Sequence, residues 1–203
     1  TPENVMNGSV VVMKVQTGEV LAIASKPSFD PNEFAAGITP ENWKKLINDE
    51  MHPLQNRSIH SQYPPGSTYK IAVGFAALEE GIIDPETTIN CPGHFKLGRG
   101  RYRCWKKNGH GDVNLHDALV QSCDVFFYTV GHRMGIDTLA RYAKIFGFGF
   151  PTGLGLSREK SGLVPSTQWK LKHRKQPWLL GETISASIGQ GYNLVTPMQQ
   201  ANM

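Results

Sequence analysis

The chain has 203 residues, of which 39% are hydrophobic and 19% are charged, and its formal net charge at pH 7 is +4. A chain of this size and ordinary globular composition can form one domain with a sizeable core, or part of a larger domain. No apolar run is long enough to span a bilayer and no signal peptide opens the sequence, which excludes a membrane segment in this sequence but not in a longer parent.

Runs of β-branched residues and one helix-capping pair predict the first secondary-structure elements. The segments Ser9–Val15 and Val20–Ser25 predict a β-hairpin around the turn sequence TGE. A proline-punctuated loop follows. Thr39 is placed to cap a short helix with Pro40 at its first position, and that helix is expected to end near Ile47.

The middle of the chain begins with an apolar helix, predicted from Ser67 to about Glu80 and ended by Gly81. Residues 84–112 hold five glycines and two prolines with little periodicity, so a long irregular segment is expected there. Helical patterns follow it at residues 115–122, 124–135, 136–149 and 166–173, then a glycine-rich turn within 182–195, then a helix opened by Thr196 and Pro197.

Strands come first in this order and helices cluster later, which predicts an α+β fold: a sheet with packed helices plus a mainly helical lobe. We expect residues 1–83 to supply the hairpin and the apolar helix, and residues 84–203 to supply the helical lobe with its irregular insertion. The chain opens at TPENVMNGS and stops inside a predicted helix, so we expect it to be part of a longer protein.

Ser67 and Lys70 form the first candidate catalytic pair. Residues three apart lie on one face of a helix, so the Ser67 hydroxyl and the Lys70 amine can meet. A serine becomes a nucleophile when a base takes its proton, and a lysine serves as that base in apolar surroundings such as the helix that follows. The alternative is a helix-capping serine beside a solvated lysine.

Ser122 and Asp124 form the second candidate pair, an S-x-D triplet between two predicted helices. In an extended triplet, alternate side chains point the same way, so both can face one cleft. They would supply a second hydroxyl for proton transfer and a polar group for substrate. The alternative is that one of them caps the helix beginning at Val125.

Four segments, YPPGSTYK, SCDVFFY, WKKNGHGDV and SIGQGYNLVTPMQ, together with the opening GSVVVMKVQTGEVLAIASKPSFDPN, resemble the transpeptidase domain of class B penicillin-binding proteins, in the elongation-type penicillin-binding protein 2 group. The resemblance covers essentially the whole chain. It implies the penicillin-binding protein and serine β-lactamase type of fold, and a peptidoglycan D,D-transpeptidase that needs no catalytic cofactor. It further implies that β-lactams acylate the same serine.

The resemblance also implies residue roles. Ser67 attacks the stem peptide and forms an acyl-enzyme, Lys70 is the general base and Ser122 relays the proton. Asp124 contacts the substrate amide, at a position where relatives often carry Asn, and Gln190 and Gly191 lie on the substrate side of a cleft-edge loop. The family location is the periplasmic side of the inner membrane, with an anchor, a pedestal domain and cell-elongation partners that include a glycosyltransferase.

The family's third motif, K-[ST]-G on an inner strand, has one match here, Lys160-Ser161-Gly162. We interpret this match as a decoy, because it follows Ser122 too closely, sits among charges in a turn-like stretch, and precedes Pro165. The true motif and the C-terminal strands are then expected beyond Met203. On its own, this chain would be weakly active or inactive.

Three cysteines and one histidine predict a structural zinc site. Cys91, Cys104, His110 and Cys123 fall close together and offer the four sulfur and nitrogen ligands of a closed site. With Cys123 between Ser122 and Asp124, such a metal would hold the second motif in place. The alternative is a Cys91–Cys104 disulfide with Cys123 buried, and the competing ligands are His94 and His116.

Parts of the sequence are also compatible with other functions. Basic stretches near 96–107 and 170–175 include tryptophans, as nucleic-acid binders do, but no recognition motif accompanies them. Solvated faces, or a surface near anionic glycan and lipid, are therefore expected instead of a nucleic-acid partner. A class D type serine β-lactamase shares the S-T-x-K form and usually has S-x-V at the second motif. The non-enzymatic alternative is a β-lactam sensor or a scaffold for elongation proteins.

Overall fold

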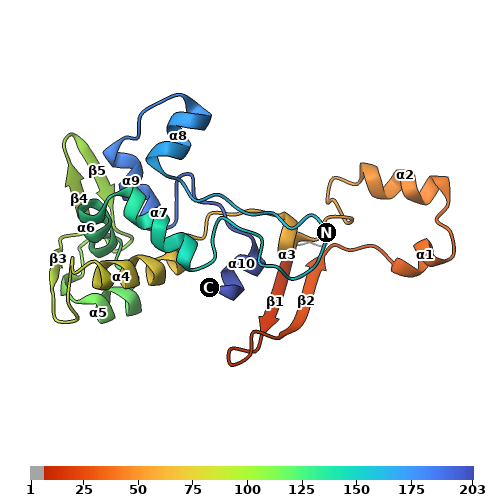
Figure 1. Cartoon of the computed structure of the whole chain (residues 1–203), viewed down its shortest axis with the longest axis horizontal. Helices are drawn as coiled ribbons and strands as arrows, with labels where there is room; N and C mark the ends of the chain where they lie inside the picture. Colours follow the sequence, from red (N-terminus) through yellow and green to blue (C-terminus); the bar gives the residue numbers. More distant parts are fainter. Residues whose placement is uncertain (1–6) are drawn as a thin grey trace. The chain divides into compact units, whose positions relative to one another are not determined.

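The structure, a computed structural model, describes residues 7–203 (Figure 1). Its strands are β1 Gly8–Met13, β2 Val20–Lys26, β3 Ile89–Cys91, β4 His94–Leu97, β5 Gly100–Arg103 and β6 Gly111–Val113. Its helices are α1 Pro31–Ala35, α2 Pro40–Asn48, α3 Arg57–His60, the 3₁₀ turn η1 Gly66–Tyr69, α4 Lys70–Glu79, α5 Leu115–Val120, α6 Asp124–Met134, α7 Ile136–Ile145, α8 Thr167–Arg174, α9 Leu180–Ala186 and α10 Pro197–Asn202.

Contacts divide the chain into two compact units that are described one at a time. The first unit takes in residues up to 63, 150–161 and 196–203, and the second takes in residues 64–149 and 162–195. Within residues 7–203, no helix combines the length and the apolar character that a membrane crossing requires.

The first unit is built on the predicted hairpin. Strands β1 and β2 pair antiparallel with Ser9 opposite Ser25, and the register shifts at Val12/Met13. The predicted helix α2 is confirmed, because the Thr39 hydroxyl accepts the Asn42 N–H at 3.2 Å and Pro40 holds the first position.

Two short helices of this unit were missed where we expected loops. Helix α1 begins at Pro31 behind the capping Asp30, and helix α3 begins behind the capping Asn56. The Asp30-Pro31 pair carries the same capping signal as Thr39-Pro40, so the sequence held a cue for α1. No comparable proline marks α3.

The second unit has α6 at its centre, in contact with α4, α7 and α9 (Figure 1). Phe126 and Phe127 on α6 are fully buried, and so are Ala76 and Ala77 on α4. Helix α9 approaches closely because Gly131 has no side chain: a Cβ there would lie 2.3 Å from the Cβ of Ser187. This packing fixes α4 and α6, the two helices whose first residues are Lys70 and Asp124.

Residues 84–112 are not irregular as expected. They contain two small antiparallel sheets, β3 with β6 and β4 with β5. Strands of three or four residues are too short to show a two-residue periodicity, which is why the pattern did not reveal them. Residues 182–186, which we placed in a glycine-rich turn, belong instead to helix α9.

Candidate active site

Ser67 lies in the 3₁₀ turn η1, on the exposed surface of the second unit. The predicted continuous helix is therefore wrong at its start, because α4 begins only at Lys70. Neither Ser67 nor any other side chain caps this turn, whose N-cap residue is Pro65. The Ser67 hydroxyl is thus available for other contacts, and the alternative of a capping serine does not hold.

Lys70 is buried, with 1% of its side chain exposed. Its ammonium donates to the Ser122 carbonyl at 2.9 Å, to Ser122 Oγ at 3.1 Å and to Asp124 Oδ1 at 2.6 Å. The ring of Phe127 lies 5.4 Å from the same nitrogen. Lys70 is therefore not the solvated residue of the alternative interpretation, because its side chain is buried and three protein oxygens accept hydrogen bonds from its nitrogen.

Ser122 joins the two motifs. Its hydroxyl donates to Ser67 Oγ at 3.1 Å, so hydrogen bonds connect Ser67 to Lys70 through Ser122. Hydroxyl hydrogens rotate, so the same chain of groups can carry a proton from Ser67 to the lysine. The triplet is not extended as expected: Ser122 has φ +51°, in the left-handed region, and Asp124 already begins α6. This turn brings both the carbonyl and the hydroxyl of Ser122 to Lys70.

Asp124 does not cap α6, whose N-cap residue is Cys123 without a side-chain hydrogen bond. Its two oxygens are divided between partners: Oδ1 binds Lys70, and Oδ2 accepts the backbone N–H of Trp105 at 3.1 Å. Trp105 also donates from Nε1 to the Gln121 carbonyl at 3.0 Å. Sequence reasoning missed this contact of Trp105.

The loop with Gln190 and Gly191 adjoins the Ser67 turn. The Gly66 N–H donates to the Gly189 carbonyl at 3.0 Å. A Cβ on Gly189 would lie 2.3 Å from the Gly66 oxygen, so this approach requires glycine. A Cβ built on Gly66 would lie 3.7 Å from the Gln190 side-chain nitrogen. The structure therefore brings Gln190 beside the residue that precedes Ser67.

The four predicted zinc ligands lie close together, and one of them, Cys123, is the middle residue of the Ser122–Asp124 triplet. The ligand atoms of Cys91, Cys104, His110 and Cys123 all lie within 4.8 Å of one another. His110 Nδ1 is 3.5 Å from Cys91 Sγ and 3.6 Å from Cys104 Sγ. The three cysteines are free, so the structure does not contain the alternative disulfide. The competing histidines lie elsewhere, His94 against Arg101 and His116 against Asp117.

The donor set fits a tetrahedral metal ion. Burial, followed by the charge of Lys106, lowers the pKa of His110, which favours the neutral imidazole that binds metals. Burial, with smaller contributions from Cys91 and Cys104, raises the pKa of Cys123 to about 12. Without a cation nearby the Cys123 thiol therefore stays protonated, whereas a metal ion held between the three sulfurs would favour thiolates. Zinc is a cation that thiolate and imidazole ligands bind well.

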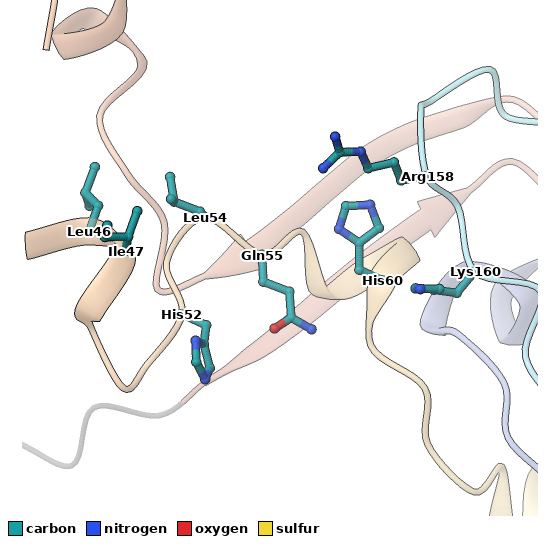
Figure 2. A pocket seen from close by; sticks show the side chains of 8 residues that line it. All are labelled: Leu46, Ile47, His52, Leu54, Gln55, His60, Arg158 and Lys160. Atoms are coloured by element: carbon teal, nitrogen blue, oxygen red, sulfur yellow. The ribbon is translucent and has the colours of Figure 1, made fainter. Parts of the chain in front are cut away.

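Lys160, Ser161 and Gly162 lie in irregular chain and not on a strand. Figure 2 shows Lys160 at a pocket of the first unit, of about 520 Å³, together with Arg158 and His60. The Ser161 carbonyl accepts from the Gln199 side chain at 2.8 Å. None of the candidate residues of the second unit lines that pocket, whose other lining residues are Leu46, Ile47, His52, Leu54 and Gln55.

The chain is similar to proteins of one known family. Residues 8–203 match the family described as penicillin binding protein transpeptidase domain. A Haemophilus influenzae protein named peptidoglycan D,D-transpeptidase MrdA is 46% identical over 198 residues, which cover 97% of this chain and 30% of that protein. The chain thus spans about a third of the length of this relative.

Two solved structures are similar throughout. Pseudomonas aeruginosa PBP2 in complex with WCK 5153 has a TM-score of 0.93 and 42% identity, over 96% of this chain and 43% of that one. Helicobacter pylori PBP2 in complex with MreC has a TM-score of 0.91 and 41% identity, over 95% of this chain and 36% of that one. The predicted α+β fold of the penicillin-binding type is therefore confirmed.

Proposed function

This chain belongs to the penicillin-binding protein transpeptidase family, and on that premise we propose that it carries the acylation site of a peptidoglycan D,D-transpeptidase. The observation that carries the proposal is the hydrogen-bonded series Ser67–Ser122–Lys70. It joins a surface nucleophile to a buried amine through one hydroxyl. The relative named a D,D-transpeptidase supports the same reaction.

The residues perform the acyl transfer as follows. Lys70 acts as the base after its ammonium has released one proton to solvent. Ser67 Oγ then bonds to the carbonyl carbon of the penultimate D-Ala of a stem peptide, and its proton passes through the Ser122 hydroxyl to Lys70 Nζ. Asp124 holds the ammonium that forms. The carbonyl–nitrogen bond breaks, and the terminal D-Ala leaves as an amine after taking the proton back. An amine of a neighbouring stem peptide then attacks the ester, forms the cross-link and frees Ser67.

The same site accounts for penicillin binding. The strained amide of a β-lactam presents a carbonyl carbon to Ser67, and opening of the ring forms an ester at the same oxygen. We propose that Gln190 and Gly191 lie on the substrate side, because the Gly189 backbone is bonded to Gly66 beside the nucleophile. Asp124 would contact the substrate amide from its place next to Lys70.

A structural zinc ion belongs to this proposal. Cys91, Cys104, His110 and Cys123 would hold it, and it would supply a cross-link and no reaction step. Cys123 lies between Ser122 and Asp124 in the chain, while Trp105 follows Cys104 and bonds Asp124. Two of the proposed ligands therefore adjoin residues of the candidate active site.

The wider context is proposed from the relatives. The chain would form the N-terminal part of one transpeptidase domain, with residues 1–83 and 84–203 as its predicted halves and the K-[ST]-G strand beyond Met203. The full protein would act on the periplasmic side of the inner membrane, held by an anchor outside this chain. Its partners would include a protein like MreC, since MreC is bound to PBP2 in the Helicobacter pylori complex, and a glycosyltransferase.

Labelled penicillin G tests the function. A transpeptidase site gives an acyl-enzyme that persists for many minutes, whereas a class D type β-lactamase releases the hydrolysed drug rapidly. A sensor or scaffold domain also keeps the label, but it leaves stem peptides uncross-linked. Persistent label in the full-length protein together with loss of cross-linking in Ser67→Ala supports the proposal, and rapid release of the drug contradicts it.

A further inference from the structure

The hairpin of β4 and β5 presents basic side chains on one face. Residues 94–107 contain six lysines and arginines and no aspartate or glutamate, and all six are exposed: Lys96, Arg99, Arg101, Arg103, Lys106 and Lys107. None of these six forms a salt bridge with any carboxylate in the part of the chain that the structure describes, residues 7–203.

The register of the hairpin sets basic residues opposite each other. Lys96 pairs with Arg101 and His94 pairs with Arg103, so both outward-facing rows are basic. Like charges directly opposite one another on a sheet destabilise it. Arg101 donates to His94 Nδ1 at 3.3 Å, so this ring nitrogen accepts, and the positive charges that face each other are those of Lys96 and Arg101. The hairpin thus holds positive charges together without an anion of its own.

The opposite face of the hairpin fixes it to the second unit. Phe95 and Tyr102 each lie about 6 Å, between ring centres, from Tyr128 on α6. Helix α9 leaves room for Tyr102 only because residue 181 is glycine, where a Cβ would lie 2.3 Å from the Tyr102 hydroxyl. Figure 1 shows β4 and β5 beside α6. The basic face is therefore presented by an anchored element and not by a loose loop.

The hairpin also leads directly to the candidate active site. Strand β5 ends at Arg103, and Trp105, two residues later, donates its backbone N–H to the Asp124 carboxylate that holds Lys70. The Arg103 carbonyl accepts from the Tyr128 hydroxyl at 3.3 Å. An elongated ligand whose end reaches Ser67 thus has the basic face within the same compact unit.

We propose that the outward face of the β4–β5 hairpin, with Lys96 and Arg101 at its centre, is a binding site for the carboxylates of uncross-linked peptidoglycan strands. This inference rests on the proposed function and extends it from the reacting peptide to its neighbours. Stem peptides repeat along a glycan chain, and each carries free carboxylates. A row of such groups matches a rigid face of unpaired cations, which raises the local concentration of substrate.

The test compares two double variants of the full-length protein that lose the same charge. Lys96→Gln/Arg101→Gln removes the central pair, and Lys44→Gln/Lys45→Gln removes two exposed lysines of α2. Binding to purified uncross-linked strands is measured at about 50 mM salt, with thermal unfolding as the folding check. We expect the hairpin variant to bind about threefold to tenfold more weakly, a typical effect for two exposed charge contacts, and the α2 variant to bind as the unmodified protein does.

Further arms distinguish the source of the anion. Removing the stem peptides with an amidase should lower the affinity of the unmodified protein at least to that of the hairpin variant for intact strands, because the Ser67 site then loses its peptide as well. Equal binding by the hairpin variant and the unmodified protein overturns the inference. The inference is also overturned if the unmodified protein binds stem-free glycan as tightly as intact strands. The same holds if Lys96 and Arg101 are needed for binding to phosphatidylglycerol vesicles but not for binding to strands. Acylation by penicillin G is measured on the same preparation. Absence of a Ser67 adduct contradicts the proposed function. If the protein is acylated but its affinity for strands is unchanged by the hairpin substitutions, only this inference is contradicted.

Discussion

The Asp124 carboxylate lies 2.6 Å from the ammonium of Lys70, and the lysine side chain is 1% exposed. The two residues are 54 positions apart, at the starts of α6 and α4. Removal of one partner of such a pair leaves a buried charge without its counter-ion.

We expect Asp124→Ala to lower the free energy of unfolding by about 3 kcal/mol. Asp124→Asn should cost less, because an amide oxygen still accepts from Lys70. Urea denaturation of the full-length protein measures both. Glu19→Ala is the matched control, since its pair with Lys14 is largely exposed and should contribute less than about 1 kcal/mol. An Asp124→Ala effect no larger than that of Glu19→Ala would show that the pair is not a stabilising contact.

Ser122→Ala removes the hydroxyl that links Ser67 to Lys70 but keeps the backbone carbonyl that also binds the lysine. We therefore expect acylation by penicillin G to slow by about 10²- to 10⁴-fold, as for loss of a proton-transfer group, with little change in stability. The rate constant of acylation is measured by incubating the protein with labelled penicillin G and quenching the reaction at successive times. Ser157→Ala, an exposed serine of the first unit, should leave the rate unchanged. Unchanged acylation in Ser122→Ala would exclude the proposed relay.

Alanine variants of Gly189 and Gly191 distinguish the effect of a steric clash from the effect of backbone strain. Both have positive φ, +70° and +72°. A Cβ at Gly189 would lie 2.3 Å from the Gly66 oxygen, whereas one at Gly191 would meet its nearest atom at 3.6 Å. We expect both alanine variants to carry the strain of a positive φ, and Gly189→Ala alone to displace the Ser67 turn and slow acylation further. Equal acylation rates in the two variants would contradict the role given to the Gly66–Gly189 contact.

One zinc ion per chain is expected in the purified full-length protein by elemental analysis. Cys123→Ser should lose most of it, since serine is a poor zinc ligand, and should lower the unfolding temperature. His116→Ala, a histidine outside the cluster, should keep the metal. A protein without zinc, in which two of the three cysteines are oxidised, would contradict the metal hypothesis and favour the disulfide alternative.

Much of the fold was predictable where one local signal decides the structure. The β-branched hairpin and the Thr39-Pro40 start of α2 needed no distant contact. The pairing of Ser67 with Lys70 was more subtle. Helical spacing placed the two on one face, but the structure joins them through Ser122, which lies 55 residues from Ser67.

The features that escaped prediction depend on tertiary contacts. Strands β4 and β5 are four residues each, too short for periodicity to reveal. The left-handed conformation of Ser122 has no marker in the sequence, since glycine is the usual residue there. The bond from the Trp105 backbone to Asp124 uses a group that every residue except proline carries, so no side-chain pattern could indicate it.

The central claim is that Ser67 is the acylated nucleophile. Mass spectrometry of the full-length protein after incubation with penicillin G, followed by peptide mapping, tests it most directly. The account predicts one penicilloyl adduct per chain, on the peptide that contains Ser67, and none in Ser67→Ala. An unmodified protein, or an adduct that persists in Ser67→Ala, would contradict it.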